Sequence, residues 1–244
     1  MPPPLKKESA RGIGSGSQYA RKVKAQKIDP IIIHVAYEGE KAEKDYFEAL
    51  ASSISKRFRN LVILFPVPKS AQGSAPDKVV GDLVEHLDSK SINLKKTTSH
   101  AGFIVIDTDH HFTGTHNRGT QDALKLCKQK GIEIAITNPC FELWQMCHLA
   151  DISGKDAEFK EKLFQNRKHP TSTTQTFSKV EYSKLREGLS SEELIKLIPT
   201  ALEYEKKVND ELEDETNLSP PKGLYSGISK IIDKMVEAGF ILST

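Results

Sequence analysis

Four short runs of apolar, mostly β-branched residues alternate with stretches of helical periodicity over the first 150 residues. This alternation is typical of βαβ units, whose strands form one parallel sheet. Because the runs are apolar throughout rather than at every second residue, helices should cover both faces of the sheet. The predicted strands are residues 31–37, 61–65, 103–106 and 132–136, and the predicted helices are residues 41–57, 77–87, 120–130 and 140–150.

The segments on either side of this α/β core differ from it in composition. Residues 1–29 contain a proline run, the segment GIGSGS and seven basic residues without apolar periodicity, which predicts a flexible basic N-terminal arm. The α/β domain then covers residues 30–150. After residue 150 the strand pattern stops, and residues 151–244 are predicted to form a helical extension. Its predicted helices are residues 157–164, 179–187, 191–212 and 225–238.

Charge and composition exclude several classes of protein. The 35 basic and 33 acidic residues give a net charge of +2, which neither requires nor excludes a nucleic-acid partner. No apolar run approaches the roughly 20 residues that cross a bilayer, and the opening MPPPLKKESARG lacks the apolar stretch of a secretory signal. Three cysteines, an odd number, argue against a disulfide framework. We therefore expect a cytoplasmic protein without a membrane partner.

Acidic residues follow three of the four predicted strands. Glu38 and Glu40 follow the first strand, Asp107 and Asp109 follow the third, and Glu142 comes shortly after the fourth. Because the carboxyl ends of parallel strands share one edge, where open α/β sheets bind ligands, these side chains should converge. Asp107 and Asp109 are two residues apart, so their side chains lie on the same side of an extended chain.

Carboxylates gathered without neighbouring cations repel one another, and a bound cation relieves this repulsion. Mg²⁺, or Mn²⁺ in its place, prefers oxygen ligands and completes its shell with water and substrate phosphates. One or two such ions can hold a phosphodiester, activate a water and stabilise the leaving oxygen. The pattern therefore indicates metal chemistry at this edge, although an exposed acidic turn and a simple strand end remain the alternative.

Three separated motifs in this region form a longer signature. They are Glu38-Gly39-Glu40-Lys41 with Glu43 and Tyr46-Phe47, then Asp107-x-Asp109, and then Asn138-Pro139-Cys140-Phe141-Glu142-Leu143-Trp144 followed by His148. Together, over about residues 30–150, they resemble the RloB family of Toprim-domain proteins, which includes the second component of AbiL phage-exclusion systems. Beyond residue 150 the resemblance is faint.

The resemblance implies a Toprim-like fold, in which helices sandwich a parallel sheet, and Mg²⁺-dependent phosphoryl transfer. It makes Glu38 a metal ligand or general acid/base and makes Asp107 and Asp109 metal ligands. Glu40 and Glu142 match further acidic positions, and we expect Glu142 to support catalysis. It also implies prokaryotic defence against phage, often with an ATPase partner of the AAA/ABC type. The combined prediction is a metal-dependent nuclease acting on DNA or RNA, with tRNA among the candidate substrates.

Other residues could contact the substrate or support the carboxylates. Lys41, near a predicted helix start, could bind phosphate or be an ordinary solvated lysine. His110 and His111 could shuttle protons or simply belong to a polar loop. We expect His148 to hydrogen bond within the core rather than to act in catalysis. Asn138 and Glu40 complete this group. The spacing of Cys140, Cys147 and His148 does not fit a zinc site.

Two alternative functions remain open. A HAD-like phosphatase would use the first aspartate of Asp107-x-Asp109 as a nucleophile and form an aspartyl phosphate, although that motif ordinarily follows the first strand. A catalytically silent Toprim-like subunit would instead sense a phage component or hold an ATPase. The oligomeric state, the number of ions and the choice between DNA and RNA stay open.

Overall fold

The computed structural model describes residues 29–70, 75–108, 112, 117–212 and 220–240. Within them a five-stranded sheet has the order β2-β1-β3-β4-β5. β1 to β4 are mutually parallel, and β5 lies antiparallel to β4 at one edge. The α/β fold with a mostly parallel sheet is therefore confirmed. The strands are β1 (Ile31–Tyr37), β2 (Val62–Pro66), β3 (His100–Asp107), β4 (Glu133–Asn138) and β5 (Tyr225–Ser226).

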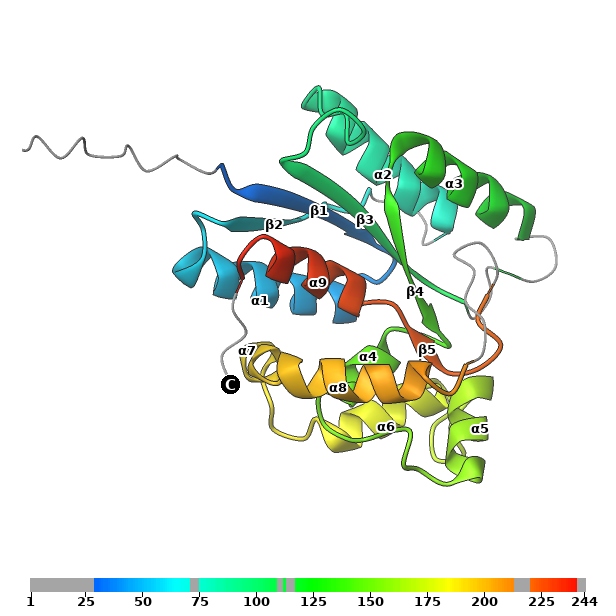
Figure 1. Cartoon of the computed structure of the whole chain (residues 1–244). Coiled ribbons are helices and arrows are strands. Elements are labelled where there is room, and N and C mark those ends of the chain that lie inside the picture. The colour runs from blue at the N-terminus through cyan, green and yellow to red at the C-terminus, as the bar shows by residue number, and fades with distance from the viewer. Residues whose placement is uncertain (1–28, 71–74, 109–111, 113–116, 213–219, 241–244) are drawn as a thin grey trace, which may run out of the picture.

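Helices cover both faces of the sheet (Figure 1). α2 (Pro76–Ser89) and α3 (Asn117–Lys130) lie on one face, and α1 (Ala42–Arg57) and α9 (Ser229–Glu237) lie on the other. Side chains alternate between the two faces along each strand, as a period of two requires. The apolar runs of the sequence therefore fill two hydrophobic cores at once. Ile33, Val35, Phe103 and Val105 pack in the core beside α1, whereas Ala36, Ile104, Ile106 and Ile136 pack in the core beside α2 and α3.

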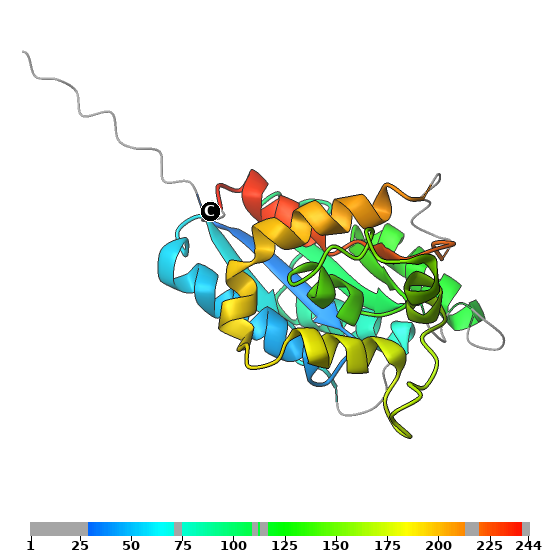
Figure 2. The same cartoon turned by 90° about the horizontal axis from the view of Figure 1, so that it is seen from below.

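A further layer of helices covers α1 and α4 (Glu142–Cys147). α7 (Ser191–Lys196) packs on α1, while α6 (Phe177–Leu185) and α8 (Ile198–Asn209) pack on α4, and Figure 2 shows these helices crossing that face of the molecule. All six residues of α4 are buried, and Trp144 shares one core with Leu194 and Ile198 from this layer. The layer comprises α5 (Ala157–Gln165), α6 (Phe177–Leu185), α7 (Ser191–Lys196) and α8 (Ile198–Asn209).

Several predicted boundaries were wrong. The helix predicted over residues 191–212 is two helices, because Pro199 lacks an N–H and begins the new helix α8 in its first turn. The first two residues of the helix predicted over residues 225–238 form β5 instead. A strand of two residues is too short to give a recognisable strand pattern in the sequence. The helix predicted over residues 140–150 is shortened to α4. The predicted basic arm falls outside the described residues, except for Asp29.

None of the helices in the described ranges is long and apolar enough to span a membrane. Cys127, Cys140 and Cys147 form no disulfide, in agreement with the prediction, and all three are buried.

Candidate active site

The turn from β1 into α1 carries two buried carboxylates. Glu38 directly follows β1 and is 7% exposed, and Glu43, in the first turn of α1, is 6% exposed. Backbone N–H groups of Glu43 and Gly39 donate hydrogen bonds to the Glu43 carboxylate. That carboxylate lies so close to Gly39 that a Cβ atom added there would be 1.8 Å from Glu43 Oε2. A residue without a side chain is therefore required at position 39 for this arrangement.

The end of β3 supplies Asp107, between β1 and β4. Asp107 is paired in register with Thr137 of β4, and Thr137 Oγ1 donates a hydrogen bond to Asp107 Oδ1. The odd-numbered residues of β3 face α1, so the Asp107 side chain emerges on the same face as the β1–α1 turn. The hydrogen bond holds one carboxylate oxygen toward β4, which fixes the orientation of the side chain.

The segment after β4 completes the cluster with Glu142, the first residue of α4, which is 7% exposed. Glu38, Glu43, Asp107 and Glu142 all line one cleft with a volume of about 480 Å³. The cleft lies at the carboxyl edge of the parallel strands, where open α/β sheets bind ligands. Three acidic positions that are distant in the sequence are therefore brought together, as the strand pattern predicts. Across the cleft are Asn166, Thr176, Lys179 and Arg186 from the α5–α6 region.

Burial and mutual repulsion raise the pKa values of two of these carboxyl groups. The pKa of Asp107 lies well above its usual range because of burial and the charges of Glu43, Glu38 and Glu142. Burial, with Glu142 as a further contributor, raises the pKa of Glu43 to about 7. The positive charge of Lys179 partly opposes this shift. The acidic cluster is therefore only partly compensated by positive charge. Its cationic neighbour, Lys179, is far from the carboxylates in the sequence and was not predicted.

The donor chemistry of the cleft fits a hard divalent cation, since carboxylate oxygens are the ligands that Mg²⁺ prefers. Within the described residues, however, no group of three His, Cys, Asp or Glu side chains is already arranged to hold a metal ion. Asp109, one of the three predicted ligands, lies outside the described residues, as do His110 and His111. Glu38, Asp107 and Glu142 are the predicted catalytic residues that the structure places around a common space, and Glu40 and Lys41 also line it.

Glu40 and Lys41 lie at the rim of the cleft. The Glu40 side chain is 87% exposed and forms an ion pair with Lys69 at 3.7 Å. Lys69 also donates a 2.7 Å hydrogen bond to the backbone carbonyl of Glu38, so it ties the loop after β2 to the β1–α1 turn. Lys41 is exposed at the start of α1. Glu40 therefore takes no part in the buried acidic cluster.

Asn138 does not line the acidic cleft, because its side chain is committed to the chain around β5. Its Nδ2 donates to the carbonyls of Pro221 and Gly223, each at 2.7 Å, and its Oδ1 accepts from Thr108 Oγ1 at 2.6 Å. Asn138 was predicted to contact substrate or to support the carboxylates, and its hydrogen bonds within the described residues give it a structural role. It anchors the segment that leads into β5.

His148 is buried at the end of α4, away from the cleft. Its Nδ1 lies 3.0 Å from the carbonyl of Trp144, which can only accept, so Nδ1 carries the proton. Its Nε2 then accepts from the hydroxyl of Tyr46 at 3.2 Å. Burial lowers the pKa of His148 to about 4. The imidazole is therefore neutral and hydrogen bonded within the core.

Cys140 lines the cleft but is poorly suited to act as a nucleophile. Burial, together with the charges of Glu142 and Asp107, raises the pKa of its thiol well above the usual range. Its Sγ lies 3.1 Å from Ser178 Oγ. The thiol therefore stays protonated and has a structural hydrogen bond.

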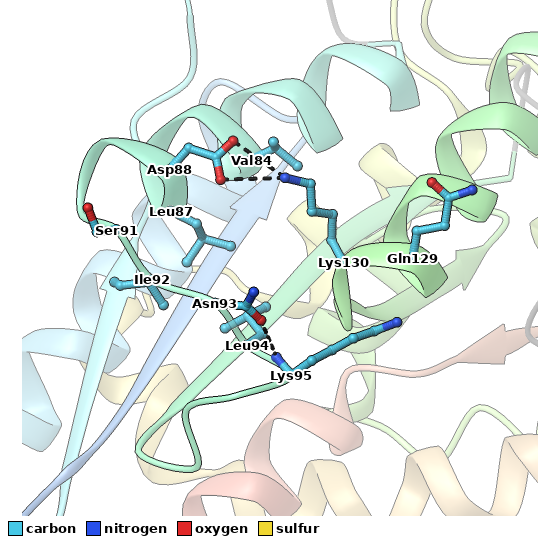
Figure 3. A pocket seen from close by; sticks show the side chains of 10 residues that line it. All are labelled: Val84, Leu87, Asp88, Ser91, Ile92, Asn93, Leu94, Lys95, Gln129 and Lys130. Atoms are coloured by element: carbon cyan, nitrogen blue, oxygen red, sulfur yellow. Dashed lines mark hydrogen bonds and ion pairs between the residues drawn. The ribbon is translucent and has the colours of Figure 1, made fainter.

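A second hollow, of about 280 Å³, lies near the start of β3 between the C-terminal ends of α2 and α3 (Figure 3). Its floor is apolar, and at its rim Lys130 points toward Asp88, with which it forms an ion pair at 3.4 Å. It contains none of the predicted site residues. The acidic cleft is therefore the better candidate for catalysis.

Among the charged residues that line the cleft, Glu43 and Lys179 were not predicted as candidate site residues. Glu43 belongs to the first motif and lies four residues after Gly39, so its position in the sequence could have indicated that it lines the site. Lys179 lies far along the chain and carried no signal of its own.

A comparison with known protein families matches residues 33–235 to the model described as RloB-like protein. This match continues well beyond residue 150, into the helices that cover α1 and α4. Neither the curated proteins nor the solved structures contain a match to this chain.

Proposed function

The chain belongs to the RloB-like family, and we propose that it is a metal-dependent nuclease that cleaves phosphodiester bonds in DNA or RNA. The observation that carries this proposal is the convergence of Glu38, Glu43, Asp107 and Glu142 on one cleft at the carboxyl edge of the sheet. Gathered carboxylates with raised pKa values are typical of catalytic and metal-binding sites.

In this proposal Glu38, Asp107 and Asp109 hold Mg²⁺ or Mn²⁺, and Glu142 supports them, with Glu43 as an additional carboxylate. When bound, such an ion would polarise the phosphodiester and promote attack by water. The protein's own groups orient the acids. Thr137 holds one oxygen of Asp107 toward β4, and the N–H groups at the β1–α1 turn hold Glu43.

The biological setting is part of the proposal and is supported by the family resemblance. The nuclease would act in the cytoplasm during prokaryotic defence against phage, restrained by an ATPase partner of the AAA/ABC type until infection. Cellular RNA such as tRNA is then a candidate substrate beside DNA.

A cleavage assay tests the chemistry. The purified chain is incubated with plasmid, single-stranded DNA and tRNA, in Mg²⁺ or Mn²⁺ and in EDTA. We expect cleavage only with the metal. Asp107→Ala should lower the cleavage rate by about 100-fold or more, because loss of a metal ligand should have a larger effect than loss of a residue that only orients a metal ligand. Asp122→Ala serves as the matched control, since Asp122 is an exposed aspartate on α3 paired with Lys125.

The outcomes separate the alternative functions. Cleavage that resists EDTA would contradict the metal mechanism. An aspartyl phosphate trapped on Asp107 would favour a HAD-like phosphatase, although Asp107 ends the third strand along the chain. No cleavage of any substrate would favour either a silent interaction subunit or a nuclease that lacks its activator in the assay.

A further inference from the structure

The acidic cleft has a second wall that comes from the chain after residue 150. Asn166, at the end of α5, and Thr176, at the start of α6, line it with Lys179 and Arg186 of α6 and its C-terminal end. The carboxylates come from the sheet edge, the first turn of α1 and the start of α4, so residues from both parts of the chain line the same space. The cleft is thus acidic on one side and basic on the other.

Hydrogen bonds fix the start of α6 relative to the segment that carries Glu142. Asn166 Oδ1 accepts from the backbone N–H of Ser178 at 3.1 Å, and Asn166 Nδ2 lies 3.5 Å from Cys140 Sγ. Cys140 Sγ in turn lies 3.1 Å from the fully buried Ser178 Oγ. Since Lys179 follows Ser178 directly, its backbone is held at a defined place opposite the carboxylates.

The two cationic side chains of this wall, Arg186 and Lys179, differ in how many hydrogen bonds they make within the protein. Arg186 donates from Nε to the carbonyl of Leu189 at 3.0 Å and from Nη2 to Ser191 Oγ at 3.2 Å, and its guanidinium lies over the ring of Tyr182. Lys179 is exposed, and its side chain makes no hydrogen bond or ion pair with any residue that the structure describes. It lines the same cleft as Glu43, and its positive charge lowers the pKa of that carboxyl group. Lys179 is therefore the cation of this wall that is available to a ligand.

A phosphate ester approaching this cleft meets several carboxylates at once. Even with a divalent cation bound, the carboxylates repel the non-bridging oxygens of a nucleic-acid strand. A lysine on the facing wall offers a mobile positive charge with three donors for such an oxygen.

We propose that Lys179 binds a phosphate oxygen of a nucleic-acid strand placed across the carboxylates, and so is a substrate-binding residue contributed by the helical layer. This inference rests on the proposed function for its ligand class. It gives residues 166–186 a direct part in the site rather than only a supporting part in the core.

Binding is measured in an Asp107→Ala background, so that cleavage does not interfere. A fluorescently labelled single-stranded oligonucleotide is titrated in Mg²⁺, and fluorescence anisotropy gives Kd over a range of salt concentrations. Adding Lys179→Ala should weaken binding by about tenfold, as expected for one charge-assisted contact. It should also reduce the slope of log K against log salt by about 0.7, the value for one phosphate contact with a single strand.

Two further variants make the comparison specific. Lys179→Arg keeps the charge and should restore most of the binding. Lys162→Ala removes an exposed lysine of α5 that pairs with Glu158 outside the cleft, and it should leave both Kd and slope unchanged. Thermal unfolding of each variant verifies that the fold is intact.

Equal affinities and equal salt slopes for the Lys179→Ala and Lys162→Ala variants would overturn the proposal, and so would the absence of oligonucleotide binding in this background. Failure of the nuclease proposal has a different signature. Binding that depends on Lys179, without cleavage by the wild-type chain, would reject the nuclease and keep the lysine contact. Cleavage by the wild type that Lys179→Ala leaves unchanged would reject only the lysine contact.

Discussion

Replacement of Gly39 by alanine should disable the acidic cleft while leaving the fold in place. The added Cβ atom would lie 1.8 Å from Glu43 Oε2, 2.2 Å from Cδ and 2.5 Å from Oε1. Real Cβ atoms essentially never approach other heavy atoms within 3.0 Å, so Oε2 must move by at least 1.2 Å, the difference between 3.0 and 1.8 Å. Glu43 would then leave the position that its hydrogen bonds from the β1–α1 turn define.

The effects on stability and on activity should separate. The clash involves the end of a flexible side chain, so the free energy of unfolding should fall by only about 1 kcal/mol, at the low end for an overpacked site. A displacement of about 1 Å in a catalytic cluster can lower the rate by about 100-fold, and we expect a loss of this order in the nuclease assay.

The assay compares cleavage rates and urea unfolding for the wild type, Gly39→Ala and Gly81→Ala. Gly81 lies within α2, and a Cβ atom there would meet nothing within 4 Å. Gly81→Ala should therefore raise stability by about 0.5–1 kcal/mol, because alanine is the better helix former, with no change in cleavage. Cleavage by Gly39→Ala at the wild-type rate would contradict this prediction, and so would a loss of more than about 3 kcal/mol of stability.

Two other substitutions test features outside the cleft. Asn138→Ala should lower stability by about 2–4 kcal/mol in urea unfolding, because it removes three hydrogen bonds to Thr108, Pro221 and Gly223; a loss below about 1 kcal/mol would contradict the anchoring role. Glu205→Gln should change the pH dependence of stability. Burial raises the pKa of Glu205 to about 7, so between about pH 4.5 and 7 the unfolded chain releases a proton that the folded chain keeps. The free energy of unfolding of the wild type should therefore fall by up to about 3 kcal/mol as pH rises through this window, because of Glu205. The Glu205→Gln variant should not show this fall. Urea unfolding at pH 5 and pH 7.5 measures this, and the same wild-type-to-variant difference at both pH values would count against it.

Much of the architecture could be predicted from local patterns. β1 was predicted with its observed bounds, because a continuous apolar run with β-branched residues has one natural place in a covered parallel sheet. The convergence of Glu38, Asp107 and Glu142 followed from the same pattern, since parallel strands put their carboxyl ends at one edge.

Other features depend on contacts between residues far apart in the chain. Asn138 was a reasonable site candidate from its motif, yet the carbonyls of Pro221 and Gly223 occupy both its N–H donors. β5 could not be foreseen, because a two-residue strand exists only where β4 offers an edge to pair with. Asp109, His110 and His111 lie outside the described residues, and their predicted roles stay predictions.

The amino-acid sequence by itself determined the four parallel strands, the sheet edge that carries the carboxylates and the motifs shared with the RloB-like family. These depend on the order and periodicity of residues close together in the chain. Only the tertiary structure decided that Glu43 lies over Gly39, that the chain around β5 holds Asn138 away from the cleft, and that Lys179 lines the cleft with the acids. The physical reason is that charge and hydrogen-bonding partners act through space, and the packing of α6 against α4 brings together groups that the sequence keeps some forty residues apart.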